Sequence, residues 1–255
     1  MRNIWAIYRR EMYAFFTSPI AYVVIAFFLF LYGYFFTDYL YRFRMYGFQV
    51  AQYGGARTLN VNQDLIRWLF HSTSVLVLFM LPLVTMRSFA EEKRSGTIEL
   101  LLTSPITDFQ IVFGKFLASL SLYGVMIGAT LLHMGLLFRY GNPEWKPLVA
   151  GYLGMLLLGG AFVALGLLFS TLTKNQIVAA FLSFGVFLFL WLVEYMKDWV
   201  GPGYGDLVTY LSVTKHIEEF AKGVVDTKDV IYYLTFIGFG LFLAKQSVEA
   251  QRWRG

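Results

Sequence analysis

Residues 148–173 read LVAGYLGMLLLGGAFVALGLLFSTLT and contain no charged side chain. A helix rises about 1.5 Å per residue, so about 20 apolar residues cross the roughly 30 Å hydrocarbon layer of a bilayer. This window is 26 residues long, which is more than that length. The window therefore predicts a transmembrane helix.

The composition of the whole chain supports the same prediction. Hydrophobic residues make up 58% of the 255 residues and charged residues only 15%, against roughly 25% charged in soluble domains. The 26 Phe, 17 Tyr and 6 Trp residues exceed what a soluble core of this size encloses, which excludes a typical water-soluble globule. The absence of cysteine excludes a disulfide framework, a thiolate metal site and a cysteine nucleophile. A net charge of +5, dispersed along the chain, does not indicate nucleic-acid binding.

Six charge-free windows occur along the chain. They are Met12–Thr37, Trp68–Met86, Phe116–Phe138, Leu148–Thr173, Asn175–Val193 and Val230–Ala244. They predict an all-α integral membrane protein with six transmembrane helices in a single domain over residues 1–255. The last window has 15 residues, so it can span only if Lys245 extends its ammonium group back to the interface.

An even number of spans places both termini on one side of the membrane. Putting them in the cytoplasm gives 11 Lys and Arg residues on that side and 10 outside, so the positive-inside rule favours this orientation only narrowly. We expect a multi-pass protein of the inner or plasma membrane with both termini cytoplasmic. Two outer segments, 38–67 and 197–229, are then too long for simple turns.

These outer segments differ in pattern. The first is rich in Tyr and Phe, which suggests aromatic cover over the bundle. In the second, apolar residues recur at helical spacing with Glu218, Glu219 and Lys222 between them. The apolar residues are Ile217, Phe220, Ala221 and Val224. The pattern predicts a short amphipathic helix before the last span.

Residues 1–17 have a periodicity of their own. At about 100° per residue, six apolar side chains fall within an arc of about 120°, opposite Arg2, Asn3, Arg9 and Arg10. The six are Ile4, Trp5, Tyr8, Met12, Phe15 and Phe16. This pattern predicts a helix lying in the membrane interface. Ser18-Pro19 supplies an N-cap and a first-turn proline, which predicts an elbow; the alternative is one tilted span over residues 4–36.

The densest charged stretch on the predicted inner face lies between the second and third spans, from Arg87 to Pro105. Thr107 and Gln110 have the spacing of a capping box for the third span. Gly96 is expected to be the N-cap of a short amphipathic helix, with Glu99 at its third position. A push on such a helix would tilt the spans that flank it. The alternative is an interfacial loop whose charges are simply solvated.

The stretch Glu91-Glu92-Lys93-Arg94-Ser95-Gly96-Thr97-Ile98-Glu99-Leu100-Leu101 resembles the signature of type-2 ABC permeases, the membrane subunits of ATP-binding-cassette exporters. Pro105 stands where that family has its following proline. The resemblance covers essentially the whole chain and is greatest to the branch of gliding-motility and copper-processing permeases. It implies that residues 88–104 form a cytoplasmic coupling helix that docks on a nucleotide-binding subunit.

The resemblance also assigns roles to individual residues. It implies that Glu91, Glu92, Lys93 and Arg94 offer charge partners to the nucleotide-binding subunit and that Gly96 forms a tight turn. It also implies that Leu100 and Leu101 anchor the helix to the membrane domain. The implied coupling residues are Glu91, Glu92, Lys93, Arg94, Gly96, Thr97, Glu99 and Leu100. The chain contains no Walker motif, so ATP and Mg²⁺ are expected on a separate ABC ATPase subunit and no cofactor on this chain. The protein is then a transport subunit and not itself an enzyme.

A second segment also resembles the family. Leu211-Ser212, His216, Phe220 and Gly223 follow its Leu-Ser-x-x-x-His-x-x-x-Phe-x-x-Gly pattern, although Val213 stands where many relatives carry proline. By resemblance, residues 216–229 form an outer gate, with His216, Phe220, Gly223 and Asp229 as its residues. The resemblance further implies a dimer with a second copy or a related permease, with the seam and translocation path along the first, second and fifth spans.

Few ionisable residues lie in or beside the predicted spans. Lys115 is expected to be an interfacial anchor that snorkels, and Glu194 an interface residue near Trp199. His71 and His133 have no second ligand at metal-binding spacing, so we expect structural histidines and no metal site. Small residues are expected to let helices pack closely. They are Gly151, Gly154, Gly159, Gly160 and Ala164 in the fourth span, and Gly238, Gly240 and Ala244 in the sixth.

These observations favour the permease half of an ATP-driven exporter. An ion-coupled secondary carrier is less favoured, because the sequence has neither mid-membrane acidic residues nor paired broken helices. A membrane scaffold or anchor of a larger machine, moved by ATP without passing a solute, fits the same charged helix. The transported substrate does not follow from the sequence.

Overall fold

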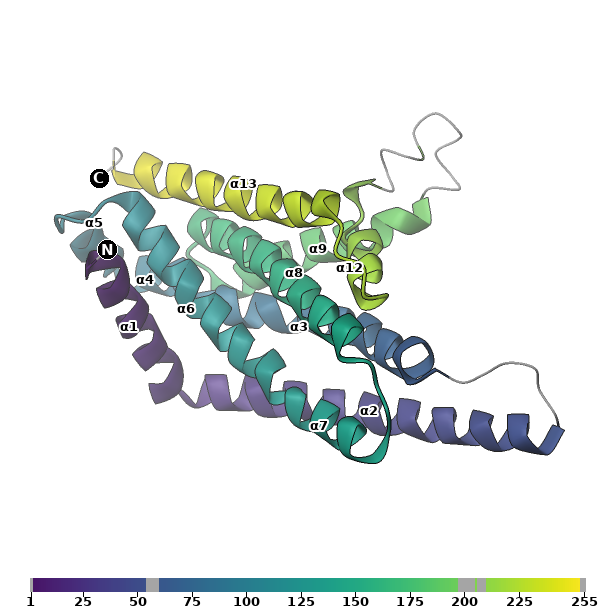
Figure 1. Cartoon of the computed structure of the whole chain (residues 1–255). Coiled ribbons are helices and arrows are strands. Elements are labelled where there is room, and N and C mark those ends of the chain that lie inside the picture. Colours follow the sequence, from purple (N-terminus) through teal and green to yellow (C-terminus); the bar gives the residue numbers. More distant parts are fainter. Residues whose placement is uncertain (1, 54–59, 197–204, 206–209, 253–255) are drawn as a thin grey trace.

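The computed structural model describes residues 2–53, 60–196, 205 and 210–252, and within these ranges every regular element is a helix. The long helices lie side by side, and Figure 1 places α4, α5 and both ends of the chain at one end of the bundle. The elements are α1 (Arg2–Thr17), α2 (Pro19–Tyr53), the π-helical turn η1 (Asn62–Ile66), α3 (Arg67–Thr85), α4 (Arg87–Ser95), α5 (Ile98–Leu102), α6 (Asp108–Ala129), α7 (Leu131–Tyr140), α8 (Trp145–Leu172), α9 (Gln176–Leu192), the 3-10 turn η2 (Val193–Met196), α12 (Val213–Ala221) and α13 (Thr227–Arg252).

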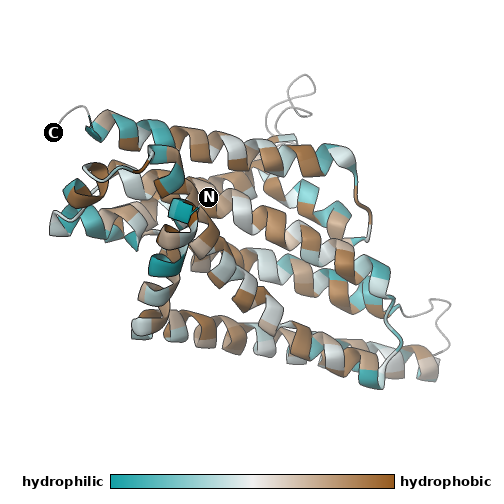
Figure 2. Ribbon diagram, turned by 60° about the vertical axis from the view of Figure 1, so that its left-hand side comes forward, coloured by the Kyte–Doolittle hydropathy of each residue, from teal (hydrophilic) through white to brown (hydrophobic). Residues whose placement is uncertain are grey.

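In the described residues, five helical stretches are long and apolar enough to cross a membrane. They are Pro19–Gln52, Asn62–Ser95, Asp108–Tyr140, Trp145–Leu172 and Thr227–Arg252. The predicted fifth span is α9, an apolar helix of 17 residues that is shorter than these, so the count of six spans stays a prediction. Figure 2 shows hydrophobic residues along the long helices and hydrophilic residues mainly towards their ends.

Several helices extend beyond the windows predicted for them. α2 continues from Pro19 to Tyr53, so residues 38–53 of the predicted first outer segment continue the helix of the first span. Asp38 and Arg42 lie one turn apart on α2 and form an ion pair of 2.8 Å, which is compatible with a continuing helix. Likewise α13 has 26 residues, and Lys245 pairs with Glu249 on its own helix. A charge-free window therefore marks the apolar part of a helix and not its ends.

Parts of two predicted features lie outside the described residues. Residues 54–59 belong to the first outer segment, and 197–204 and 206–209 to the second. The side chain of Glu194 and the residues Lys197 and Trp199 are also outside that part of the chain. The predicted amphipathic helix of the second segment is present as α12.

The amino-terminal elbow is present, but its faces differ from the prediction. α1 ends at Thr17 and α2 begins at Pro19, and the Ser18 hydroxyl accepts a hydrogen bond from the Ile20 N–H at 3.4 Å. The buried residue of α1 is Ile7, whereas Trp5, expected on the apolar face, is 64% exposed. The inward face of α1 is chosen by its contacts with the rest of the protein and not by hydrophobicity alone.

α8 is the central helix, and its glycines receive side chains from the helices around it. A Cβ atom on Gly151 would lie 2.2 Å from the Phe70 ring, and one on Gly166 would lie 2.2 Å from the Thr85 hydroxyl. The same close approach occurs at Gly154, Gly159 and Gly160 on α8 and at Gly240 on α13, where it meets Ala164. The predicted packing role is confirmed for these glycines except Gly166, which the sequence did not single out, whereas the predicted Gly238 has open space around it.

Replacing Gly159 by alanine tests this packing. The new Cβ would lie 2.0 Å from the ring of Tyr123, a fully buried residue of α6 whose hydroxyl donates to the Met155 carbonyl at 2.8 Å. Such overpacking costs about 1–3 kcal/mol, so the free energy of unfolding in mixed detergent micelles should fall by that amount. Gly185→Ala is the matched control, because Gly185 of α9 has no neighbour within 4 Å. Equal stability of the two variants would contradict the packing assignment.

Candidate functional site

The charged stretch after the second span forms two short helices and not one. α4 ends at Gly96, which has φ of 75°, in the left-handed region where glycine is favoured. α5 begins after Thr97, so the prediction that Gly96 is its N-cap and Glu99 its third residue is wrong. The capping box of the third span is confirmed, since Thr107 and Gln110 exchange hydrogen bonds of 3.3 Å at the start of α6.

A serine of α8 holds the beginning of α4. The Ser170 hydroxyl accepts hydrogen bonds from the N–H groups of Phe89 at 2.9 Å and Ala90 at 3.1 Å, and it donates to the Met86 carbonyl at 3.0 Å. The first N–H groups of a helix have no partner inside that helix, so a buried helix start needs an acceptor from elsewhere. Phe89 and Ala90 are fully buried, and Ser170 therefore fixes α4 on the end of α8.

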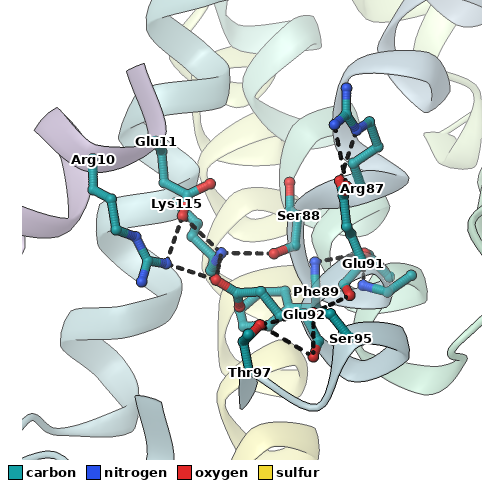
Figure 3. A network of polar contacts seen from close by, with 12 residues as sticks. Arg10, Glu11, Arg87, Ser88, Phe89, Glu91, Glu92, Ser95, Thr97 and Lys115 are labelled. Carbon is teal, nitrogen blue, oxygen red and sulfur yellow. Dashed lines mark hydrogen bonds and ion pairs between the residues drawn. The ribbon is translucent and has the colours of Figure 1, made fainter. Parts of the chain in front are cut away.

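Lys115 of α6 joins three helices at this end of the bundle (Figure 3). Its ammonium lies 2.9 Å from a Glu11 oxygen of α1 and 3.0 Å from a Glu92 oxygen of α4, and it donates to the Ser88 carbonyl at 2.6 Å. Arg10 contacts the same oxygens of Glu11 and Glu92, at 2.8 and 2.6 Å. Two cations and two carboxylates thus balance in one cluster.

This cluster overturns the prediction for Lys115. Its side chain is 1% exposed, so it does not extend to the interface as a snorkelling anchor. The ammonium also lies 5.0 Å from the centre of the Phe89 ring, within the range of a cation–π interaction. All its donors are used inside the protein, and α1, α4 and α6 are therefore held to one another through a single buried charge.

The pKa of Glu11 is shifted by the charges of the cluster. Burial raises the pKa of its carboxyl, but the charge of Lys115 and the hydrogen bonds from Arg10 and Lys115 outweigh burial and hold the pKa below its ordinary value. A lowered pKa means that the folded protein favours the ionised carboxylate. The contribution of Glu11 to stability is therefore complete above its ordinary pKa and is lost as the pH falls through the lowered one.

Further contacts connect α4 to the end of α8, and the end of α13 to α8 and to the start of α6. The Lys93 ammonium donates to the Thr171 carbonyl of α8, and the Gln251 amide of α13 donates to the same carbonyl at 2.9 Å. Arg252 pairs with Asp108 at 2.8 Å and donates to the Ile106 carbonyl at 3.1 Å, next to the end of α5. The α4–α5 hairpin, residues 87–102, is thus tied to three other helices, α1, α6 and α8, and α13 is tied to the ends of α8 and α6 beside it.

Some of the predicted coupling residues bind other side chains or carbonyl groups of this chain, and others are exposed. Glu92 and Lys93 are engaged inside the chain, as described above, and Glu91 pairs with Arg87 on α4 at 2.8 Å. Thr97 shares a hydrogen bond of 2.9 Å with the Ser95 hydroxyl. Arg94, Glu99 and Leu100 are exposed.

Leu100 and Leu101 of α5 face different ways. Leu101 is 8% exposed and packs into the core, as expected of an anchor, whereas Leu100 is 74% exposed. The prediction that Leu100 anchors α5 to the membrane domain is wrong, because neighbouring residues on a helix point about 100° apart. Leu100 therefore lies on the outward surface of the hairpin together with Glu99.

The predicted gate residues come together at the other end of α8. His216 Nδ1 lies 2.6 Å from an Asp229 oxygen, and His216 Nε2 lies 3.0 Å from the Tyr210 carbonyl oxygen. Both side chains of the pair are buried, and the imidazole stacks on the Tyr232 ring with 3.8 Å between centroids. The pair thus joins α12 to the first turn of α13.

Phe220 and Gly223 fix the other side of α12. Phe220 is fully buried against Gly154, where a Cβ atom would lie 2.5 Å from its side chain. Gly223 has φ of 87° and approaches Pro147 of α8 so closely that a Cβ atom would lie 2.8 Å away. α12 is therefore packed on α8 and α13; the role of these residues as a gate stays a prediction.

The two histidines of the spans lie among aromatic rings. His133 has its ring edge-on to Tyr32 and Phe36, with centroids 5.2 and 5.0 Å away, and His71 lies near Trp68 and Trp191. Among the described residues, no three His, Cys, Asp or Glu side chains are grouped as a metal site needs. His71 is exposed and His133 is partly buried, and their structural role stays a prediction.

Residues 5–244 match the family described as "ABC-2 family transporter protein". This chain belongs to the ABC-2 transporter family. Its sequence is also 30% identical over 147 residues to the "Probable multidrug ABC transporter permease YbhR" of Escherichia coli K12, and equally to that of E. coli O157:H7. The alignment covers 56% of this chain but only 39% of these relatives, so the chain spans well under half of their length. The family and the apolar helices together identify a multi-pass membrane permease of an ABC transporter.

Replacing Lys115 by methionine tests the cluster in this ABC-2 permease. Glu11 and Glu92 would keep only Arg10, and breaking a buried pair costs about 3–5 kcal/mol. We expect the free energy of unfolding in detergent to fall by that amount and trypsin to cut at Arg9 and Arg10 faster. Lys245→Met is the control, because its partly exposed pair with Glu249, one turn apart on α13, is worth about 0.3–0.5 kcal/mol. A loss no greater than that of the control would show that Lys115 does not hold α1.

A double-mutant cycle tests the His216–Asp229 pair. His216→Gln leaves a buried carboxylate without its partner and should lower the free energy of unfolding by about 3–5 kcal/mol. Asp229→Asn removes the charge and should cost less. The double variant should then be more stable than the sum of the single effects predicts, by about 0.5–3 kcal/mol. Strict additivity of the two substitutions would contradict a direct interaction.

Proposed function

We propose that this chain is the permease subunit of an ATP-driven exporter, in which a separate ABC ATPase docks on the α4–α5 hairpin. The proposal depends on the observation that this hairpin has one side packed on the protein and another side that is exposed. Its inward side is fixed to α1, α6 and α8, while Arg94, Glu99 and Leu100 face outward without being used in the core. A force applied to the outward side therefore reaches the membrane helices.

The local geometry supports this transmission. Gly96 sets the angle between α4 and α5, and the capping box at Thr107 sets the start of α6. Lys115 couples α4 to both α6 and α1. ATP-driven closure of two nucleotide-binding subunits would push the hairpins of two permeases, either identical copies or related chains, and reorient their helices from inward-closed to outward-open.

The remaining parts of the proposal follow from this arrangement. The hairpin is at the same end as both termini, so a cytoplasmic ATPase requires cytoplasmic termini in the inner or plasma membrane. α8 ends on the cytoplasmic side and α13 begins on the outer side, so the chain between them has to cross the membrane once. α9 is then the sixth span. At the far end, α12 with its His216–Asp229 pair is the outer gate. The segment containing this pair supports placement in the gliding-motility and copper-processing branch.

Leu100→Asp tests the docking surface. The charge lies on the exposed side of α5, so we expect the chain to fold normally but to bring down at least tenfold less ABC ATPase when the tagged protein is purified from its own cells. Leu172→Asp is the matched control, because Leu172 is an exposed leucine at the same end of the bundle, on α8. Copurified ATPase is measured by ATP hydrolysis and by mass spectrometry.

Two results would contradict the proposal. One is undiminished recovery of the ATPase with Leu100→Asp; the other is labelling of a single cysteine at Arg94→Cys by an impermeant maleimide added outside intact cells. The chain has no native cysteine, so the label reports this one position. Export itself is tested by comparing passenger accumulation outside the cell with and without the ATPase partner.

A further inference from the structure

The inward face of α1 is fixed on the beginning of α6. Ile7 is buried against Gly114, where a Cβ atom would lie 2.8 Å from its side chain. The Asn3 amide donates to Gln110 at 3.2 Å, one turn before Gly114, and Glu11 meets Lys115. α1 therefore lies along the first two turns of α6, and its opposite face points away from the bundle.

That opposite face is a stripe of basic and aromatic residues. Arg2, Trp5, Arg9 and Tyr13 fall within an arc of about 80° at 100° per residue. All four are exposed, Tyr13 at 74%, and with Ala6 and Arg10 they line a shallow open hollow. We call these four residues the α1 stripe.

The charge of the α1 stripe is not balanced within the protein. Glu11 is the one acidic residue of α1, and it faces inward to Lys115. In the part of the chain that the structure describes, no ion pair joins Arg2 or Arg9 to a carboxylate, whereas Arg10 is held by Glu11 and Glu92. The stripe thus offers two uncompensated guanidinium groups beside two exposed aromatic rings.

The position of α1 brings this stripe to the membrane surface. Only Ser18 separates α1 from α2, a helix long and apolar enough to cross the membrane, and α1 is steeply inclined to α2 (Figure 1). α6 belongs to another candidate span, Asp108–Tyr140, and α1 packs on its first turns. In a membrane crossed by α2 and α6, a face directed away from α6 at this level would point sideways at the depth of the lipid headgroups.

We propose that the α1 stripe binds the phosphate groups of anionic phospholipids in the leaflet at the end of the bundle that carries both termini. Guanidinium groups bind phosphate oxygens bidentately, and Trp and Tyr rings prefer the level of the headgroups. Each basic residue near an anionic leaflet contributes about 1 kcal/mol, which for two arginines corresponds to a roughly 25-fold difference in affinity. α1 is then held to the protein by Lys115 and to the membrane by its opposite face.

The test is a lipid titration of the full chain. Ala6→Cys places a single cysteine in the hollow, since the chain has no other, and an environment-sensitive fluorophore there reports binding as phosphatidylglycerol is added to protein in neutral detergent. We expect saturable binding that phosphatidylcholine does not reproduce. Arg2→Gln with Arg9→Gln should weaken the apparent Kd for phosphatidylglycerol roughly 25-fold.

The matched control removes two cations elsewhere at the same end. Arg94→Gln with Lys174→Gln lowers the net charge equally, and both side chains are exposed but off α1, so binding should stay unchanged. Circular dichroism checks that both variants keep their helical content. Equal affinity for phosphatidylcholine, an unchanged Kd in the Arg2 and Arg9 variant, or an equal loss in the control would overturn the proposal. So would competition by millimolar inorganic phosphate, because it would indicate a site for a free anion.

Discussion

A buried ammonium in a membrane protein must have all its donors satisfied by the protein, and Lys115 meets this constraint with three acceptors from two other helices. Glu11, Glu92 and the Ser88 carbonyl surround it, and Arg10 neutralises the second carboxylate. Moving α1 or α4 away would leave a charge unpaired in a region of low dielectric, which is expensive. The amino-terminal helix, the charged hairpin and the third span are therefore constrained to move together.

α8 extends this constraint to the other end of the molecule. At one end, Ser170 caps α4 and the Thr171 carbonyl accepts hydrogen bonds from Lys93 and Gln251. Towards the other end, Gly154 receives Phe220 of α12. A helix packed this closely along its length behaves as a rigid rod, since glycine contacts leave no space for side chains to rearrange. The hairpin and the His216–Asp229 pair are thus connected through one element.

The sequence was sufficient to predict the features that depend on short-range pattern. The apolar windows identified the long helices, the Thr107–Gln110 capping box was correct, and the glycines of α8 face neighbouring helices as expected. The buried position of Lys115 could not be predicted, because its partners Glu11 and Glu92 are distant along the chain and the sequence pattern shows only its own helix. The inward face of α1 could not be predicted for the same reason. It is the side that carries Ile7 and Glu11, because these residues contact Gly114 and Lys115 of α6. The sequence gives no indication that Ser170 caps α4, because a serine in an apolar window has the appearance of a small packing residue.

The geometry at Gly96 separates two reasons for a glycine in the hairpin. Its φ of 75° strongly favours glycine, yet apart from its chain neighbours no atom lies within 4 Å of the position where a Cβ would be. The residue is therefore needed for the turn and not for a close approach within this chain, unlike Gly159 or Gly223. Because the space above Gly96 is open and Leu100 is exposed on the helix that follows, the hairpin combines a fixed backbone angle with an uncovered apolar side chain. A rigid turn presenting one exposed anchor loses little conformational entropy on binding, which is the property that a force-transmitting contact requires.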